Sequence, residues 1–247
     1  MKNIFFCLVT LLTFYNSGFS NCPEITITLR TQFQVDEFKS LYPNCTELLG
    51  NLFIDGKNDI VSLDSLHLIT SINGSLIIWN NNELNNLSGL DNLAKIGQSF
   101  TIQNNNKLKN LNGLNNLAEI GEGLTIYNNF LLREIKSLSK LKNVGTDIRI
   151  DKNATLKSFL GLEGLTQISS FSIRDNYSLK NLEGLNNLQK VERDLYFFGN
   201  SIFESLSGLE SLTEIGGIRI FNTIITCLLY TSPSPRDATL SRMPSSA

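Results

Sequence analysis

The chain has 247 residues, of which 41% are hydrophobic and 18% are charged, and its formal net charge is −2. A mildly acidic chain of this kind is not expected to bind nucleic acid through a basic surface. It contains a single histidine. Histidine-based metal sites and catalytic triads therefore have little support, and neither a metal nor a cofactor is expected.

The N-terminus predicts an export signal. Lys2 is followed by an apolar run over residues 4–14 and then by small residues, so residues 1–20 are interpreted as a signal peptide cleaved after Ser20. The run is too short to span a bilayer, and no later segment approaches the roughly 18 apolar residues that a spanning helix needs. We therefore expect a secreted or cell-surface protein with no membrane insertion within the known sequence.

Residues 21–47 are predicted to form an N-terminal cap. Cys22 and Cys45 are the only cysteines outside the predicted signal and the C-terminal tail, and in an oxidising compartment they should form a disulfide. The segment just after Cys22 alternates like a strand, and Thr31 with Gln34 predicts a capping box before one short helix. The side chains that this helix is expected to bury are Val35, Phe38, Leu41 and Tyr42.

Residues 48–226 repeat with a period of 24 residues, which predicts a repeat solenoid of seven full coils and a truncated eighth. The coils begin at Leu48, Ile72, Ile96, Ile120, Val144, Ile168, Val191 and Ile215. The coil from Ile168 is one residue short. The fifth and seventh positions of each coil are apolar, which predicts a strand with those side chains inward. Glycine interrupts the leucine-rich stretch that follows, so this stretch is expected to be bent rather than helical.

An asparagine recurs just after each predicted strand. The column comprises Asn81, Asn105, Asn129, Asn153, Asn176 and Asn200. Stacked amide side chains can hydrogen-bond from coil to coil and satisfy turn backbone that would otherwise be buried without a partner. We therefore expect a structural role for this column.

The repeated pattern Ile-Gly-x-x-Leu-x-Ile-x-x-Asn, followed by Leu-x-x-Leu-x-Gly-Leu-x-x-Leu over residues 96–117, resembles the receptor L-domain type of leucine-rich repeat. Cys22 and Cys45, followed by residues 46–52, resemble the N-terminal entry of that family. The resemblance implies a right-handed β-helix of 24-residue coils behind a disulfide-closed cap. The family includes ligand-binding lobes of insulin and epidermal growth factor type receptors as well as secreted bacterial surface proteins, and the regular repeats look more like the bacterial kind.

The outward positions of the predicted strands, six and eight in each coil, are the candidate ligand-binding face, because the inward positions are committed to the core. Large aromatic side chains facing solvent are typical of recognition surfaces. The candidate anchors are Trp79, Tyr127, Tyr196 and Phe198, with Arg149 and Arg174 as polar contacts. The alternative is that outward neighbours pack only on one another along the sheet.

The predicted function is an exported, non-enzymatic binding or adhesion module whose sheet face engages a protein or a glycan. The alternatives are a ligand-binding lobe of a eukaryotic receptor and a passive surface-layer spacer. Polysaccharide-cleaving β-helices need clustered carboxylates on adjacent coils, whereas Asp55 and Asp151 share a column four coils apart. Asp151, flanked by Arg149 and Arg174, is interpreted as part of an ion-pair surface.

Residues 227–247 are interpreted as an artefact. Cys227–Asp237 and Ser241–Ala247 resemble, in one reading frame, the translation of a sequencing adapter on both sides of a variable index at Ala238–Leu240. The alternative is a genuine Ser/Pro-rich tail. We expect the natural protein to continue beyond Thr226 with a different sequence.

Overall fold

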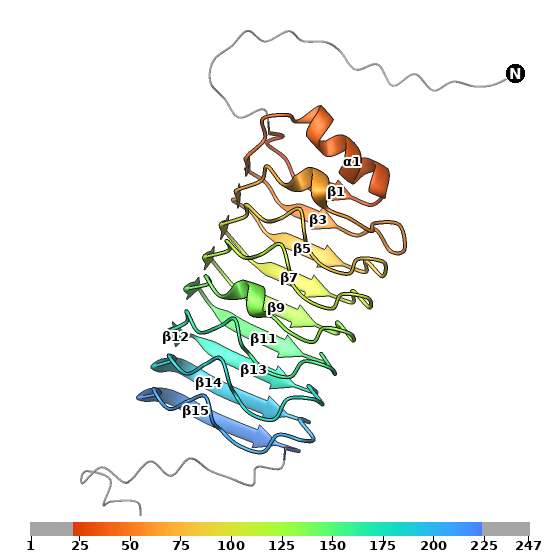
Figure 1. The fold of residues 1–247 in the computed structure, drawn as a ribbon. Coiled ribbons are helices and arrows are strands. Elements are labelled where there is room, and N and C mark those ends of the chain that lie inside the picture. The colour runs from red at the N-terminus through yellow and green to blue at the C-terminus, as the bar shows by residue number, and fades with distance from the viewer. Residues whose placement is uncertain (1–21, 224–247) are drawn as a thin grey trace, which may run out of the picture.

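The computed structural model describes residues 22–223, which form a β-solenoid of about eight turns (Figure 1). The predicted signal peptide and the predicted artefact tail lie outside these residues. Each coil adds one strand to a long parallel sheet, and five coil corners add a short strand to a second parallel sheet. The repeat solenoid predicted from the period is confirmed.

The long sheet, called sheet A here, follows the order β1-β3-β5-β7-β9-β11-β13-β14-β12, with β15 also paired to β14. Its strands are β1 (Ile27–Leu29), β3 (Leu52–Ile54), β5 (Leu76–Trp79), β7 (Phe100–Gln103), β9 (Leu124–Tyr127), β11 (Asp147–Asp151), β12 (Gln167–Ile168), β13 (Ser170–Arg174), β14 (Lys190–Phe198) and β15 (Glu214–Phe221). The second sheet comprises β2 (Glu47–Leu48), β4 (Ser71–Ile72), β6 (Lys95–Ile96), β8 (Glu119–Ile120) and β10 (Asn143–Val144).

Strand register follows the sequence period. Leu76 pairs with Phe100 one full coil later, whereas Ile148 pairs with Phe171, one residue sooner, in the short coil. A second register shift lies between Val191 and Asp194, so the eighth coil is also one residue short at the same corner. Beyond the first shortened corner the two strands of a coil fuse into the single long strands β14 and β15.

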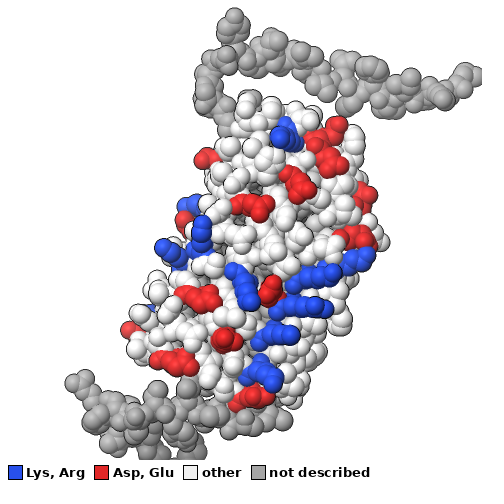
Figure 2. Space-filling model, in the orientation of Figure 1, with Lys and Arg blue, Asp and Glu red and all other residues white. Residues whose placement is uncertain are grey.

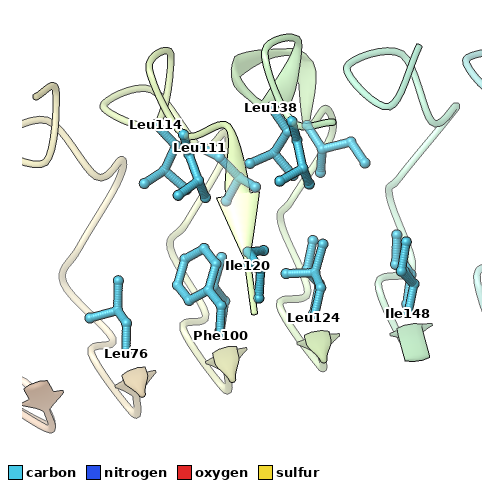
Figure 3. Close-up of a cluster of buried hydrophobic side chains, with 14 of the residues drawn as sticks. Leu76, Phe100, Leu111, Leu114, Ile120, Leu124, Leu138 and Ile148 are labelled. Atoms are coloured by element: carbon cyan, nitrogen blue, oxygen red, sulfur yellow. The ribbon is translucent and has the colours of Figure 1, made fainter. Parts of the chain in front are cut away.

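The core is one continuous stack of side chains between sheet A and the leucine-rich stretches. Figure 3 shows Leu76, Phe100, Leu124 and Ile148, the fifth positions of successive coils, in one row opposite residues such as Leu114. All of these side chains are fully buried. Parallel strands about 4.8 Å apart place equivalent side chains directly on one another, so each coil buries its apolar positions only against its neighbours.

The bend of the leucine-rich stretch depends on a glycine with a positive φ. Gly113 has φ +109°, and a Cβ there would lie 1.9 Å from the carbonyl oxygen of Leu87 in the preceding coil. Serine occupies this position in two coils, and there the chain forms the 3₁₀ turns η1 (Asp64–Leu66) and η2 (Lys136–Leu138) instead. The stretch is therefore bent in every full coil, without an α-helix.

The N-terminal cap covers the first coil of the solenoid and also adds one strand to sheet A. β1 pairs in parallel with β3, and the Cys22–Cys45 disulfide is present. The helix α1 (Gln32–Leu41) carries the predicted capping box at Thr31. The expectation that Leu41 is buried was wrong, because its side chain is 62% exposed. Tyr42, which was also predicted to be buried, is partly buried against the core, and its ring packs 5.1 Å from the Phe38 ring.

Candidate functional site

The six predicted ligand-binding residues lie on the strands of sheet A at outward positions, but they separate into two groups. Trp79 stands at the end of β5, near the cap. The other five come from β9 to β14, two to five coils closer to the opposite end of the described rod. Gln103 on β7 lies in register between Trp79 and Tyr127, the nearest of the five, so Trp79 is separated from the group by one rung.

Trp79 lines a hollow of about 400 Å³ on the outer face of sheet A, which we call the Trp79 hollow. Its walls come from three successive rungs of the sheet and comprise Thr28, Arg30, Phe53, Ile54, Asp55, Ile77 and Trp79. The Trp79 side chain is 44% exposed. An exposed indole beside Phe53 and Ile77 offers an apolar surface of the kind found at binding sites.

Polar groups border the same hollow. The Oδ1 atom of Asp55 is buried and has no hydrogen-bond partner among the described residues. A buried acceptor left without a partner costs free energy that a ligand donor would recover. Arg30 follows β1 directly and adds a guanidinium group, which binds carboxylates and hydroxyl-rich groups through several donors. The Trp79 hollow thus combines an apolar platform with one acceptor and one cation.

The second group is largely engaged within the protein. The Arg149 guanidinium carbon lies 5.2 Å from the centre of the Tyr127 ring, and the Lys152 Nζ lies 5.4 Å from it. Arg149 Nε also donates to Asp151 Oδ2 at 2.5 Å. For Tyr127 and Arg149 the arrangement therefore favours packing between outward neighbours, which was the alternative to ligand binding.

Asp151 occupies an outward position, yet its side chain is only 1% exposed. Arg149 covers it, and Oδ1 accepts hydrogen bonds from Ser172 Oγ (3.2 Å) and from the Arg174 backbone N–H (3.1 Å). Burial raises the pKa of Asp151 above its ordinary value of 3.8, and the charge and hydrogen bond of Arg149 oppose that rise. The predicted ion pair with Arg149 is present, while Arg174 contacts Asp151 through its backbone N–H.

This raised pKa predicts a pH dependence of stability. A carboxyl whose folded-state pKa is higher than its unfolded-state pKa stabilises the fold below the unfolded value and loses that contribution as pH rises through the folded value. The contribution of Asp151 should therefore fall as pH rises above about 3.8. We expect Asp151→Asn to gain stability relative to wild type between pH 3 and pH 7, measured by urea unfolding. A difference that is constant, or that shrinks with pH, would contradict this assignment.

Arg174 and Tyr196 border a second hollow, of about 240 Å³, near the C-terminal coils. The Arg174 guanidinium carbon lies 4.4 Å from the centre of the Tyr196 ring, and its Nε is buried without a hydrogen-bond partner in the described part of the chain. Tyr196 also packs 5.8 Å from the Phe221 ring. Phe198 is 38% exposed and pairs in register with Phe221 on β15.

The asparagine column lies fully buried at the turn that follows sheet A. Asn105 Oδ1 accepts the backbone N–H of Asn81 at 2.9 Å, and Asn105 Nδ2 donates to the Ile78 carbonyl at 2.9 Å. The same pair of bonds recurs at Asn129, Asn153, Asn176 and Asn200. Each asparagine therefore completes the turn of the coil before it. Thr223 Oγ1 takes the accepting role for the backbone N–H of Asn200, at 3.3 Å.

Within residues 22–223, no group of three or more His, Cys, Asp and Glu side chains is placed to hold a metal ion. No helix in this range is both long enough and apolar enough to cross a membrane. His67 lies at the end of η1, where Nδ1 is 2.7 Å from the Asp64 carbonyl oxygen.

The fold defines a class of protein, the β-solenoid of leucine-rich coils. Within it, the receptor L domain family model matches residues 44–105, which span the first two coils and part of the third. The match confirms, over these residues, the resemblance seen in the sequence. A search of curated proteins found no match. A search of solved structures found none either.

The receptor L domain is an extracellular ligand-binding module and is not a known enzyme family. The disulfide of the cap fits an extracellular protein. The family match therefore supports the predicted binding role.

Sequence reasoning missed Arg30 as a member of the Trp79 hollow. The cap was treated as separate from the coils, although β1 occupies the rung before β3 with Leu29 opposite Ile54. Arg30 could have been located from the sequence, because it follows Leu29 directly. Leu29 is level with Ile54, so Arg30 is level with the outward residue Asp55 of the next rung. Phe53, Asp55 and Ile77 were recognised as outward but were not selected, because an aromatic or charged side chain alone did not reveal the hollow.

Proposed function

We propose that the chain is an exported, non-enzymatic binding module that holds a protein or glycan ligand in the Trp79 hollow on the outer face of sheet A. The observation that carries the proposal is the coincidence, in one hollow, of a 44% exposed tryptophan and a buried acceptor without a partner, Asp55 Oδ1. Both features cost free energy in the unbound protein, and both are relieved when a ligand covers the indole and donates to Asp55.

The family match supports a binding role but does not name the ligand. A sugar ring could stack on Trp79 while a hydroxyl donates to Asp55, and a peptide could insert an apolar side chain beside Phe53 while its N–H groups donate. A secreted or cell-surface location follows from the same proposal. The alternatives are a eukaryotic receptor lobe, which would use the same kind of face, and a passive spacer, which would use none.

Trp79 is the only tryptophan in the chain, so its fluorescence reports directly on the proposed site. We expect at least one ligand from a panel of neutral oligosaccharides and short peptides to change the emission of the native protein in a saturable manner. Trp79→Phe, which keeps a ring but removes the indole, should weaken a ligand identified by calorimetry about tenfold, in keeping with the loss of one interface anchor.

Two matched variants give this test its controls. Asp55→Asn keeps an acceptor and should weaken binding less than Asp55→Ala, whereas Tyr127→Phe, in the internally packed group, should leave affinity within about twofold of wild type. Equal losses for Tyr127→Phe and Trp79→Phe would place the site elsewhere on the face. A panel in which nothing perturbs Trp79 emission and nothing binds by calorimetry would favour the spacer.

A further inference from the structure

A column of exposed cations runs along the face of the rod shown in Figure 2, where Lys and Arg side chains follow one another across several coils. Its members occupy the same position of four consecutive coils, four residues beyond the asparagine column. We call Lys109, Arg133, Lys157 and Lys180 the basic column; all four are exposed. This face follows the turn after sheet A, so the basic column is separate from the Trp79 hollow.

Backbone hydrogen bonds hold the basic column in register. The Arg133 N–H donates to the Lys109 carbonyl at 3.0 Å, and the Lys157 N–H donates to the Arg133 carbonyl at 3.4 Å. Hydrogen-bonded rungs of this kind lie about 4.8 Å apart. The rod therefore presents one cation per coil at a fixed repeat along its axis.

Outside the basic column, equivalent positions of adjacent coils carry opposite charges that pair, as in Lys95–Glu119 (3.0 Å), Lys107–Glu83 (2.6 Å) and Lys190–Glu214 (3.0 Å). Lys180, the last member of the column, pairs in the same way with Glu204 of the next coil (3.6 Å). Lys109, Arg133 and Lys157 depart from this arrangement, because no ion pair engages them within the described coils. Like charges on adjacent rungs repel one another, and an anionic ligand would remove that repulsion.

The outward positions beside the basic column are mainly polar. Asn110 and Asn181 each use Oδ1 in a local turn, and no described hydrogen bond engages their Nδ2 groups. The residue directly after each of Lys109, Arg133 and Lys157 is Asn110, Glu134 and Ser158, and Glu134 is paired with Lys136 at 3.5 Å. The surroundings of these three cations thus offer hydrogen-bond donors and little competing negative charge, whereas Lys180 at the end of the column is paired with Glu204.

We propose that the basic column binds a linear acidic polysaccharide of the polyuronate class, laid along the rod axis. A polyuronate carries one carboxylate per sugar ring, and successive rings advance by a distance comparable to one rung of the solenoid. The carboxylates that face the rod would therefore meet cations of the column, while ring hydroxyls would meet the amide groups of Asn110 and Asn181. The inference goes beyond the proposed function because it concerns another face and another ligand chemistry.

Other polyanions fit the column less well. Duplex DNA presents one charge per about 1.7 Å of axis and calls for a broader basic surface than a single line of cations. Single strands are bound on aromatic side chains that stack successive bases. Here the two exposed aromatics near the column, Phe130 and Tyr177, lie two coils apart. An anionic membrane needs a basic surface accompanied by an insertable apolar face.

The test uses the secreted chain and polygalacturonate without divalent cations, measured by calorimetry at low and high salt. The matched ligand control is the fully methyl-esterified polymer, which keeps the rings and removes the charges. We expect binding of the charged polymer only, with affinity falling as salt rises. Lys109→Gln combined with Arg133→Gln and Lys157→Gln should weaken it about tenfold or more.

The matched variant removes three exposed cations elsewhere, Lys39→Gln with Lys140→Gln and Lys142→Gln, and should change affinity less than about twofold. Trp79→Phe should leave polygalacturonate binding intact, so failure here is distinguishable from failure of the Trp79 hollow. Absence of binding at low salt would overturn the proposal. So would equal losses in both triple variants, or tighter binding of oligothymidylate or of phosphatidylglycerol vesicles than of polygalacturonate.

Discussion

Gly113→Ala is expected to destabilise the rod by about 3 kcal/mol or more. Two independent causes add at this position. A φ of +109° is strained for any residue with a side chain, and the new Cβ would lie 1.9 Å from the Leu87 carbonyl oxygen. That oxygen belongs to the backbone of the adjacent coil, so relief requires the two coils to move apart and lose packing on both sides.

The matched control is Gly123→Ala in the next coil. Gly123 does not have a positive φ, and a Cβ there would find its nearest atom, the Asp147 carbonyl oxygen, at 3.2 Å. This change should cost less than about 1 kcal/mol. Thermal and urea unfolding followed by circular dichroism measure both variants. Equal unfolding midpoints for Gly113→Ala and wild type would contradict this prediction, because they would show that the contact between Gly113 and the Leu87 carbonyl oxygen adjusts at little cost.

Asn129→Ala is expected to cost about 4 kcal/mol, because it leaves two buried backbone groups without partners at about 1–3 kcal/mol each and also opens a small cavity. Asn129 Oδ1 accepts the Asn105 N–H at 3.0 Å, and Asn129 Nδ2 donates to the Ile102 carbonyl at 3.0 Å. Asn129→Asp should be at least as harmful at neutral pH, since it loses the donor and buries a charge.

The control for this prediction is Asn106→Ala, one position after the asparagine column. Asn106 is exposed and donates one side-chain hydrogen bond to Asn82 Oδ1 at 2.7 Å. Its loss should cost less than about 1 kcal/mol, because water replaces the partner. Urea unfolding of the two variants side by side makes the comparison. If the two variants lose equal free energy of unfolding, the buried amides do not have the proposed structural role.

Much of the fold was predictable because the same positions of every coil of a solenoid must be apolar. The inward fifth and seventh positions, for example Leu76 and Ile78, had to be apolar in each repeat, so their burial followed from the period alone. The bent stretch around Gly113 was predictable for the same reason. Leu41 was not, because the cap occurs once and no repeat distinguishes a helix residue facing the core from one facing outward.

The candidate site was less predictable, because outward positions are not constrained by the stack. Alternation placed Trp79 and Asp151 outward, but it did not show that Arg149 covers Asp151 while Trp79 stays exposed. Those outcomes depend on side-chain lengths on neighbouring rungs. The basic column is visible in the sequence as a spacing of 24 residues between Lys109, Arg133 and Lys157, but it lies outside the strands, where the period does not predict which side chains are exposed.

The asparagine column also gives assembly of the rod a direction. Asn105 bonds the Gln103 carbonyl of its own coil, but its Oδ1 and a second Nδ2 bond serve the coil before it, so the last coil of a growing stack has an incomplete turn until the next coil is added. A chain emerging from its N-terminus would close each turn in the order of synthesis, behind a cap that is already locked. The hydrogen bonds therefore give the stack a polarity, because each turn is completed by the coil on its C-terminal side.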